Sequence, residues 1–542
     1  MAAVKEKTPP QQASKSSSSL TTSSAKDLIA GRQAKDIIIG FCGAIGAGIN
    51  SLRTSLEEVL TESNYQVEHI HISSIMKQFP EAEHILSSNP DSYTRYKEGQ
   101  TLGDALREKY NHAILAEAAI SKITKHREEI SLQIRPLSTE ESEQAESTKS
   151  NTRVAYLVDQ LKNPAEIELL RLVYQHNFYL IGTIRSEQER KRNLRDEGID
   201  KSKIDDLIHR DRKGKDKFGQ QTEKAILDSD FFIKNTQSHK TELKKKLLRF
   251  IRLIHGTNGI SPTINEKGMY SAFSASLQSA CLSRQVGASI VDDTGDILAT
   301  GRNDVPKFGG GLYLFEDEDH DYRCVHKGGK CYNDFHKKNI QKKVSAILTT
   351  QLHELGKDTE LNNGQSIMSL FDEETVEKIA GEIQSKTPIG SLIEYSRAIH
   401  AEMDAITSLA RRESSSTVGK TLFSTTYPCH NCARHIVAAG IKKVIYIEPY
   451  DKSLALDLHD DSITEIPDDN KVMFQTFEGI SPRRYQKFFF APYDRKDKME
   501  GLALKNSVQT RYQIDIQLLE SYRDYEDRIY AEFSEKTNVV LD

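Results

Sequence analysis

The sequence is poor in the residues that hold small secreted or membrane proteins together. Its six cysteines are too few for a disulfide framework in a chain of 542 residues, so we expect reduced thiols that are available to a metal. No apolar run approaches the length that crosses a bilayer, since the longest runs, such as Ile37–Phe41, have only the length of a strand. These absences predict a cytoplasmic protein without a membrane partner.

The sequence also lacks tryptophan and any excess of positive charge. Lysine and arginine total 74 against 79 aspartates and glutamates, which gives a formal net charge of -5. Proteins that bind duplex DNA or tRNA usually carry a basic excess, and grooves for single strands are basic and lined with aromatic side chains. The composition therefore argues against a nucleic acid substrate and favours a small ligand.

The length of the chain predicts more than one domain, because a single hydrophobic core stops growing well below 542 residues. Short apolar runs alternate with helical patterns in both halves, which predicts α/β domains, the first built on a parallel sheet. The expected divisions are a disordered lead at 1–30, an α/β domain at 31–256, a second α/β domain at 257–500 with a polar insertion at about 307–390, and a helical tail at 501–542.

Individual elements follow from hydrophobic periodicity. In the first domain we expect strands at Asp36–Phe41, Val154–Val158, Phe178–Thr183 and Asp230–Asn235, and helices at Ser51–Leu60 and Thr241–His255. In the second domain we expect a hairpin of Gly287–Val291 with Ile297–Gly301, strands at Thr421–Thr426 and Lys443–Ile447, and helices at Met269–Leu282, Tyr395–Leu409 and Cys429–Ala439. The tail is expected to form one amphipathic helix, Val508–Phe533.

A glycine-rich turn follows the first expected strand. Gly43, Gly46 and Gly48 have the spacing of a Walker A loop, between the strand and the helix that this motif requires. The phosphate-gripping lysine is replaced by isoleucine, and the hydroxyl that binds Mg²⁺ is replaced by Asn50, with Ser51 beside it. Backbone amides at a helix start still suit a phosphate. We therefore expect an allosteric nucleotide sensor or an assembly scaffold, with Mg²⁺ accompanying a bound nucleotide, rather than an active kinase.

The strongest pattern pairs His400 and Glu402 with Cys429 and Cys432, which follow after about thirty residues. Two cysteines three positions apart at a helix start place both sulfurs at its positive end, where the thiolate form is favoured. His400 would supply a third ligand to Zn²⁺ and leave the fourth tetrahedral position for water. Glu402 is then the expected proton carrier.

The pattern resembles the signature of zinc nucleobase deaminases, and this resemblance implies hydrolytic attack on a cytosine ring. Zinc lowers the pKa of bound water towards roughly 7, so hydroxide becomes available to attack C4 while Glu402 carries the proton to N3 and later to the leaving ammonia. The alternative is a structural zinc, in which a fourth protein ligand completes the coordination and Glu402 is incidental. Proline before the first cysteine and the β-α-β pattern around both halves favour the catalytic interpretation.

Around these residues the sequence resembles the cytidine and deoxycytidylate deaminase family, over roughly Tyr270–Asn303 and Tyr395–Ile480. The resemblance implies a cytidine-deaminase-like α/β/α fold. The segment that begins at Ser283 looks like the deoxycytidylate branch, in which an asparagine contacts the sugar and a Ser/Arg pair lies near phosphate. The resemblance thus implies substrate contacts by Ser283, Arg284, Asn303 and Tyr450. Asn303, which precedes Asp-Val-Pro, is also typical of a turn.

The segment Tyr446–Ser453 is similar to large bacterial two-domain deaminases implicated in phage defence, which carry a nucleotide-kinase-like front half. In the first domain the sequence resembles nucleoside monophosphate kinases and dephospho-coenzyme A kinases, whose lid arginines clamp phosphates. The resemblance rests on Leu157–Asp159, Asn163–Glu166, Arg190, Arg192, Arg195 and the pair Arg210–Asp211. The resemblance implies a degenerate P-loop kinase-like domain. The alternative is that 185–217 forms a solvated helix pair, since its acidic and basic residues nearly balance.

The insertion carries a second candidate metal site. Four residues of ligating type lie within thirteen positions, at uneven spacing: Cys324, His326, Cys331 and His336. Such spacing fits a second, structural zinc but is not specific, because polar insertions also contain histidine and cysteine by chance.

The function expected from the sequence is zinc-dependent deamination of dCTP or dCMP to the deoxyuridine nucleotide, which would deplete dCTP in antiphage defence. Two alternatives remain open: an editor of cytosine or adenine in RNA or single-stranded DNA, and a nucleotide-binding regulator with a structural zinc. The family resemblance and the amphipathic tail also predict a homo-oligomer.

Overall fold

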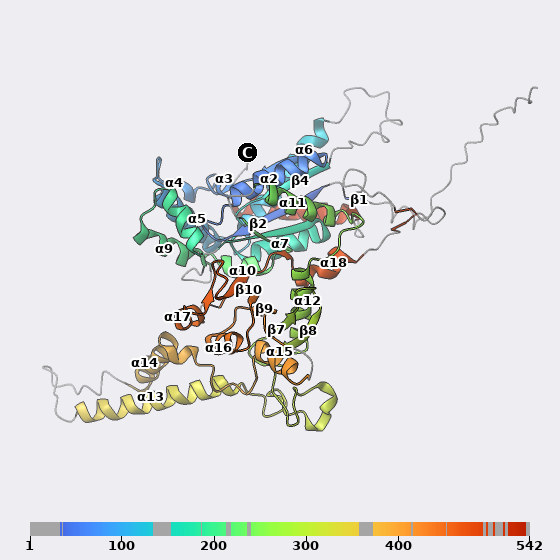
Figure 1. Ribbon diagram of the computed structural model, residues 1–542. Coiled ribbons are helices and arrows are strands. Elements are labelled where there is room, and N and C mark those ends of the chain that lie inside the picture. The colour runs from blue at the N-terminus through green and yellow to red at the C-terminus, as the bar shows by residue number, and fades with distance from the viewer. Residues whose placement is uncertain are drawn as a thin grey trace, which may run out of the picture.

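The computed structural model shows a mixed α/β protein with two bodies, each built around its own six-stranded sheet. It describes residues 33–34, 36–133, 153–185, 187–212, 218–235, 240–356, 372–412, 416–450, 452–490, 495–496, 502–503, 513–514 and 519–537. The expected disordered lead, 1–30, lies outside the described residues. In Figure 1 the first body lies above the second, and a long helical hairpin projects from the lower body.

The sheet of the first body is parallel, as expected, except for one short edge strand. Its strands, in spatial order, are β13 (Gly479–Ile480), β6 (Phe231–Lys234), β5 (Phe178–Ile184), β2 (Ile37–Gly43), β4 (Arg153–Val158) and β3 (Tyr65–Ile70). Only β13 runs antiparallel to its neighbour. Ile37 and Ile39 face one buried layer and Ile38 and Cys42 the other. A parallel strand covered on both faces needs this continuous apolar run.

Helices cover both faces of this sheet. α2 (Ile49–Glu62) and α11 (Lys240–Ile254) pack on one face, and α6 (Ile114–Gln133) and α7 (Pro164–Tyr174) pack on the other. The other helices before β6 and α11 are α3 (Ile72–Met76), α4 (Glu81–Ile85), α5 (Ser92–Lys109), α8 (Glu187–Asp196), α9 (Lys201–Arg212) and α10 (Thr222–Leu227).

The second sheet combines a hairpin with parallel strands. In spatial order it holds β11 (Ile463–Thr464), β12 (Val472–Thr476), β10 (Lys443–Glu448), β9 (Thr421–Thr426), β7 (Gly287–Val291) and β8 (Ile297–Arg302). The expected hairpin of β7 with β8 is confirmed. α12 (Ile264–Ser276) packs on one face, whereas α15 (Ala401–Ala410) and α16 (His430–Ala438) pack on the other. A short helix, α17 (Ala455–Leu458), follows β10.

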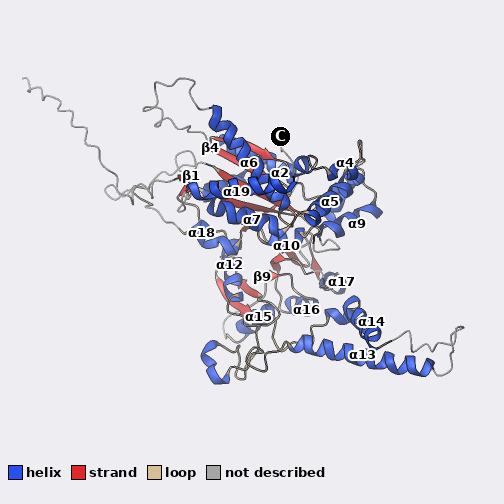
Figure 2. Cartoon of the chain, turned by 180° about the vertical axis from the view of Figure 1, so that it is seen from behind, coloured by secondary structure: helices blue, strands red, loops and turns tan. Residues whose placement is uncertain are grey.

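The polar insertion forms a helical hairpin that stands away from both sheets (Figures 1 and 2). It consists of α13 (Tyr332–Gly356) and α14 (Glu373–Lys386), which contact each other. Val376 and Ala380 of α14 are buried, but no described residue of either helix belongs to the hydrophobic clusters that form the cores of the two bodies. The polar composition of the segment agrees with this exposed position.

Two helices of the second body begin at other residues than expected. α15 begins at Ala401 and not at Tyr395, because the amide of Ile399 donates to the carbonyl of Asp304 at 3.0 Å and leaves His400 extended. α12 begins before Met269, since the Thr263 hydroxyl and the Glu266 carboxylate form a capping box. In both cases a polar contact, and not the apolar pattern, sets the first residue of the helix.

The tail differs most from the expectation. A strand, β14 (Gln513–Ile514), pairs with β1 (Gln33–Ala34), and the tail helix α19 (Leu519–Thr537) begins later than Val508 and continues past Phe533. α19 packs against α6 and α7 of the first body. There Phe533 is 1% exposed, and its ring meets Phe79 edge-on with centroids 5.9 Å apart. The last helix of the chain thus completes the core of the first body.

Glu266 joins the two bodies. It lies in the first turn of α12 and is 1% exposed. Its carboxylate accepts hydrogen bonds from both terminal nitrogens of Arg249 in α11, at 2.9 and 2.7 Å, and from the amide of Ile480 in β13, at 2.9 Å. A buried carboxylate needs such donors to offset its lost hydration. An ion pair and a backbone hydrogen bond therefore hold the junction together.

The position of Phe533 leads to a stability prediction. We expect Phe533→Ala to lower the free energy of unfolding of the first body by about 3 to 5 kcal/mol, because it removes a fully buried ring. Tyr530→Ala on the same helix, at a side chain 39% exposed, is the matched control and should change stability by less than about 1 kcal/mol. Urea unfolding followed by circular dichroism measures both. Equal effects of the two changes would show that α19 does not pack as described.

Candidate active site

Three side chains of ligating type converge at the starts of two helices in the second body. The Nδ1 atom of His400 lies 3.3 Å from the sulfur of Cys429 and 3.3 Å from the sulfur of Cys432. His400 is the N-cap of α15, and Cys429 is the N-cap of α16. The Cys429 sulfur accepts the backbone N–H of Cys432 at 3.4 Å. The residues that the sequence predicts as metal ligands therefore form one group.

The backbone around the group explains how three separate positions meet. Strand β9 delivers Cys429 to the start of α16, and the amide of Tyr427 is fixed by the carbonyl of Glu448 at 2.7 Å. Strand β8 approaches α15 so closely that a Cβ on Gly301 would lie 2.3 Å from the carbonyl oxygen of Ala401. Only glycine permits this approach. The first turn of α15 is thus held against the sheet, and His400 with it.

The electrostatics of the group favour a thiolate at Cys429, whereas the hydrogen bond to Cys429 and burial raise the pKa of the Cys432 thiol. Hydrogen bonding from the Cys432 thiol, together with the neighbouring His400 ring, lowers the pKa of Cys429 to about 4. The start of α16 adds its positive end. One ring nitrogen and two sulfurs form the donor set that Zn²⁺ prefers, with three protein ligands as in a catalytic site. The residues present therefore fit a zinc ion.

Glu402 lies beside this group, in the first turn of α15, and its side chain is buried. The Ser424 hydroxyl donates to its Oε1 at 3.1 Å, and the Cys432 thiol donates to its Oε2 at 3.5 Å. Burial raises the pKa of Glu402 above its ordinary value. A raised pKa makes this carboxyl a better proton acceptor than an ordinary glutamate, as a proton carrier requires. The sequence did not indicate the contact with Ser424.

Arg284 and Tyr450 lie at the open side of the group. The guanidinium of Arg284 sits 5.3 Å from the centre of the Tyr450 ring and pairs with Glu448 at 3.1 Å. A hydrogen bond with Cys429 raises the pKa of His400 and the charge of Arg284 lowers it, whereas burial raises the pKa of Tyr450 and the charge of Cys429 adds to the rise. Both predicted residues therefore lie near the metal ligands. Sequence reasoning missed Glu448, whose only signal was its place at the end of a strand.

Both polar atoms of the Asn303 side chain form hydrogen bonds to the protein backbone. Its Oδ1 accepts the amide of Val286 at 2.7 Å, and its Nδ2 donates to the carbonyl of Arg284 at 2.8 Å. Asn303 therefore fixes the backbone that carries Arg284, and its predicted contact with a sugar stays a prediction. Ser283 is exposed, with its hydroxyl 3.5 Å from the sulfur of Cys331.

The four residues of the predicted second zinc site are not assembled in the structure. Among the described residues, the groups of three or more ligands that lie close together are His400 with its two cysteines and a group in the first body. His326 instead contacts Asp321 at 3.2 Å, and the ring of His336 lies against Tyr395. Cys331 faces Ser283, and the charge of Arg397 acts on the Cys324 thiol.

The glycine-rich loop of the first body has the backbone that a tight turn needs. Gly46 and Gly48 have φ values of 77° and 78°, which favour glycine. Asn235 donates to the carbonyl of Gly48 at 2.6 Å and to the hydroxyl of Ser51 at 2.9 Å. Asn50 is exposed. The structure thus shows a glycine turn at the start of α2, and the binding of a nucleotide there stays a prediction.

Sequence reasoning missed Lys162 at this loop and named Asp211 only as part of the kinase-like pair with Arg210. Lys162, which comes from the turn after β4, places its amine 2.6 Å from the carbonyl of Gly43. The same amine pairs at 2.8 Å with Asp211, whose carboxylate accepts the amide of Ile45 at 2.8 Å. A lysine therefore does lie at the loop, although from another part of the chain than in a Walker A motif.

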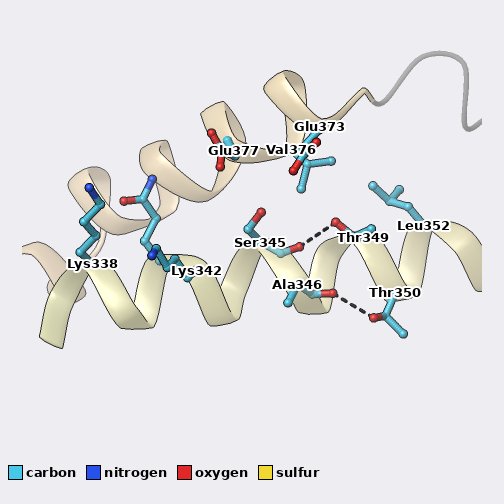
Figure 3. Close-up of a pocket in the computed structure, with 11 residues that line it drawn as sticks. Lys338, Lys342, Ser345, Ala346, Thr349, Thr350, Leu352, Glu373, Val376 and Glu377 are labelled. Atoms are coloured by element: carbon cyan, nitrogen blue, oxygen red, sulfur yellow. Dashed lines mark hydrogen bonds between the residues drawn. The ribbon is translucent and has the colours of Figure 1, made fainter. Parts of the chain in front are cut away.

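A hollow of about 1100 Å³ lies between α13 and α14, and Figure 3 shows the residues that line it. Its walls carry Lys338 and Lys342 on one helix and Glu373 and Glu377 on the other. None of the predicted site residues lines it. The hollow is therefore separate from the group around His400.

Comparisons with known proteins agree with the chemistry of this group. Residues 262–448 match the family model of the cytidine and deoxycytidylate deaminase zinc-binding region. The deoxycytidylate deaminase of Enterobacteria phage T4 is 49% identical over 55 residues, which is 10% of this chain and 28% of that protein. ComE operon protein 2 of Bacillus subtilis is 44% identical over 54 residues, 10% of this chain and 28% of that protein. The chain thus spans less than a third of these curated relatives.

Solved structures give a weaker likeness. The dCMP deaminase of cyanophage S-TIM5 in complex with dCMP and dUMP is 22% identical, with a TM-score of 0.22, and the match covers 40% of this chain and 98% of that one. The apo form of the same protein is 20% identical with a TM-score of 0.21, over 40% of this chain and 99% of that one. A search of the described residues for a helix that could span a bilayer finds none.

The ligand geometry predicts which changes remove zinc. We expect His400→Ala and Cys432→Ser each to lose about one zinc ion per chain relative to the unchanged protein, because two protein ligands hold zinc poorly. His435→Ala is the matched control, since His435 lies exposed on α16 and outside the group. Elemental analysis after dialysis measures the zinc content. Full retention of zinc by His400→Ala would contradict the assignment.

Proposed function

We propose that this chain removes the amino group of a deoxycytidine nucleotide, dCMP or dCTP, by zinc-dependent hydrolysis of the C4–N bond. The premise is that residues 262–448 belong to the cytidine and deoxycytidylate deaminase family. The products are the deoxyuridine nucleotide and ammonia. The observation that carries the proposal is the buried carboxyl of Glu402 directly beside His400 and the two cysteines. A structural zinc site has no use for a carboxyl held in that position.

The proposed chemistry assigns the proton transfers to Glu402. Zinc bound by His400, Cys429 and Cys432 would supply a nucleophile at neutral pH by lowering the pKa of water to roughly 7. Glu402 accepts the first proton of the attacking water and passes it to N3 of the ring. It then takes the second proton from the hydroxyl now on C4 and delivers it to the amino group as the C4–N bond breaks and C4 becomes a carbonyl. Ser424 holds one carboxylate oxygen, which leaves the other turned towards the metal ligands.

The substrate class rests on charge at the open side of the site. Arg284 offers a guanidinium that suits a phosphate, and its pairing with Glu448 is more than a third exposed at both partners. An exposed pair of this kind contributes about 1 kcal/mol or less, so a phosphate can replace Glu448 at little cost. Tyr450 offers a ring face near the same point. The relatives from phages T2 and T4 are named deoxycytidylate deaminases, which supports the same class.

We also propose that this reaction depletes dCTP in antiphage defence. The support is the similarity of Tyr446–Ser453 to large two-domain deaminases with that role. Loss of dCTP would slow the synthesis of phage DNA. The test compares dCTP levels and phage yield in infected cells that carry the unchanged chain or Glu402→Gln.

Glu402→Gln provides the direct test of the chemistry. We expect ammonia release from dCMP or dCTP to fall by about 100-fold or more, because the amide cannot carry the proton. Zinc content should stay unchanged, since Glu402 is not a ligand. Glu374→Gln, at an exposed position on α14, is the control and should keep full activity. Full activity in Glu402→Gln would exclude the proposed role.

The competing function is tested with the same protein. An editor of nucleic acid would release ammonia from a cytosine-containing oligonucleotide and leave dCMP and dCTP unchanged. We expect the reverse preference. A panel of dCMP, dCTP, CTP, deoxycytidine and the oligonucleotide, followed by chromatography, decides between the two substrate classes.

We further propose that the glycine-rich loop of the first body binds the phosphates of a regulatory nucleotide. Gly48 is the N-cap of α2 and offers no side-chain cap, and the first turn of the helix holds no acidic residue. Arg185 and Arg190 are 8% and 7% exposed, and guanidinium nitrogens of both lack hydrogen-bond partners among the residues that the structure describes. One terminal nitrogen of Arg185 lies 3.3 Å from where a Cβ of Gly48 would be. Buried donors without partners at a helix start favour a phosphate.

Substitution of Arg185 tests the loop proposal. We expect Arg185→Gln to weaken the binding of ATP at least about tenfold, because it removes a charge-assisted hydrogen bond. Arg252→Gln, at an exposed position on α11, should leave the affinity unchanged. No phosphoryl transfer from ATP to dCMP is expected, since the lysine of the Walker motif is absent. Equilibrium dialysis with labelled ATP gives the affinities, and equal Kd values for all three proteins would reject the site.

A further inference from the structure

The first body contains a second group of ligating side chains that the deaminase chemistry does not use. His69 Nε2 and His71 Nδ1 each lie 3.1 Å from the same carboxylate oxygen of Asp159. The ligating atoms of all three residues lie within 4.8 Å of one another. The other oxygen of Asp159 accepts the amide of Ile72 at 3.1 Å. Two imidazoles thus converge on one oxygen whose partner oxygen is already fixed.

The parallel sheet explains why these residues meet. His69 lies near the end of β3, and Asp159 follows directly after the paired strand β4. His71 comes one residue after β3 ends and is the N-cap of α3. Carboxyl ends of parallel strands are where α/β proteins place their ligand sites. The group therefore lies at the edge of the sheet from which the Gly43 loop also emerges.

Burial shows that the group is partly closed and still accessible. Asp159 is 0% exposed, whereas the side chains of His69 and His71 are 23% and 40% exposed. A wholly buried carboxylate needs compensating charge or hydrogen bonds. The exposed sides of the two rings leave a route from solvent to the point where the three residues meet.

The distances suit metal ligands as well as they suit hydrogen bonds. Ligand bonds of about 2.0 to 2.2 Å from nitrogen and oxygen to zinc place neighbouring ligand atoms about 3 to 3.5 Å apart. The two observed nitrogen-to-oxygen distances of 3.1 Å fall in this range. No large rearrangement of the three side chains is therefore needed to admit an ion.

The donor set selects the kind of metal. Two imidazoles with one carboxylate suit zinc, manganese, iron or cobalt, and leave coordination positions open. Mg²⁺ and Ca²⁺ prefer oxygen ligands and are disfavoured by two imidazoles. The group differs in this respect from the two-sulfur site of the second body.

Arg53 fixes the ring tautomer of His69 when no metal is bound. Its guanidinium nitrogen lies 2.9 Å from the Nδ1 atom of His69. Because arginine can only donate, Nδ1 accepts this hydrogen bond and Nε2 carries the ring proton towards Asp159. A metal ion on Nε2 would take the place of that proton. The ring would then carry its proton on Nδ1, so Arg53 would have to turn away.

From this geometry we propose that His69, His71 and Asp159 bind a divalent transition metal ion, independently of the deaminase zinc, and that Arg53 competes with this ion. Arg53 acts as a gate, because it stabilises the ring tautomer that has no lone pair for the metal. Removal of the guanidinium therefore strengthens metal binding, whereas loss of the histidines abolishes it.

Cobalt binding to the zinc-loaded protein tests the proposal. We expect the unchanged chain to bind one Co²⁺ in addition to its zinc, with a visible spectrum that lacks a thiolate charge-transfer band, because no cysteine belongs to the group. The double variant His69→Asn with His71→Asn should lose this ion and keep its zinc and its deaminase activity. The asparagine amides preserve hydrogen bonding to Asp159. His84→Asn, exposed on the nearby helix α4, is the matched control and should bind Co²⁺ normally.

Arg53→Gln provides an independent variant that leaves all three ligands in place. We expect it to bind Co²⁺ about tenfold more tightly, since its side-chain oxygen can accept the Nδ1 proton that arginine opposes. Unchanged or weaker binding in Arg53→Gln would overturn the proposal. So would equal binding by the double variant and the unchanged chain, or a Kd for the unchanged chain above about 1 mM. Loss of deaminase activity alone would bear on the proposed function and not on this site.

Discussion

The arrangement of the second body depends on one close approach, that of β8 to the first turn of α15. Gly301 permits this approach, because any side chain there would collide with the backbone of Ala401 and Ala405. The amide of Arg302 is also bonded to the carboxylate of Asp404 at 3.0 Å. These contacts fix the position of His400 relative to β9, which delivers the two cysteines. A shift of the helix by 1 Å would separate the ring nitrogen from the sulfurs and move Glu402 with it.

Much of this body could be predicted from the sequence, because its signals are local. β7 and β9 lie where the apolar runs placed them, and two cysteines at a helix start needed no knowledge of distant residues. Polar contacts across the chain gave no such signal. The Asp304 carbonyl delays the start of α15, and Asn303 turns its amide to the backbone of Arg284. A pattern of residues cannot show which partner a polar side chain selects.

The same limit applies to the first body. Four of the six strands and the glycine turn were visible in the sequence, whereas β3 and β13 were not predicted. The placement of Lys162 at the carbonyl of Gly43 depends on how β4 and β2 pair. The amphipathic pattern indicated a tail helix, yet its partner surface on α6 and α7 is set by the shape around Phe79 and Phe533. Periodicity predicts that a face is buried and leaves open what covers it.

The two groups of ligating residues show how one principle yields different chemistry. In each sheet a residue just beyond the end of a parallel strand supplies a ligand, Cys429 three residues after β9 and Asp159 directly after β4. Residues of neighbouring elements complete the set. Since affinity for divalent metals follows a common order, the donor atoms and not the fold must discriminate between ions. Sulfur from two cysteines favours zinc and holds it firmly, whereas imidazole and carboxylate accept several metals and exchange them. The second body thus suits a permanent catalytic ion, and the first suits an ion whose presence varies with conditions.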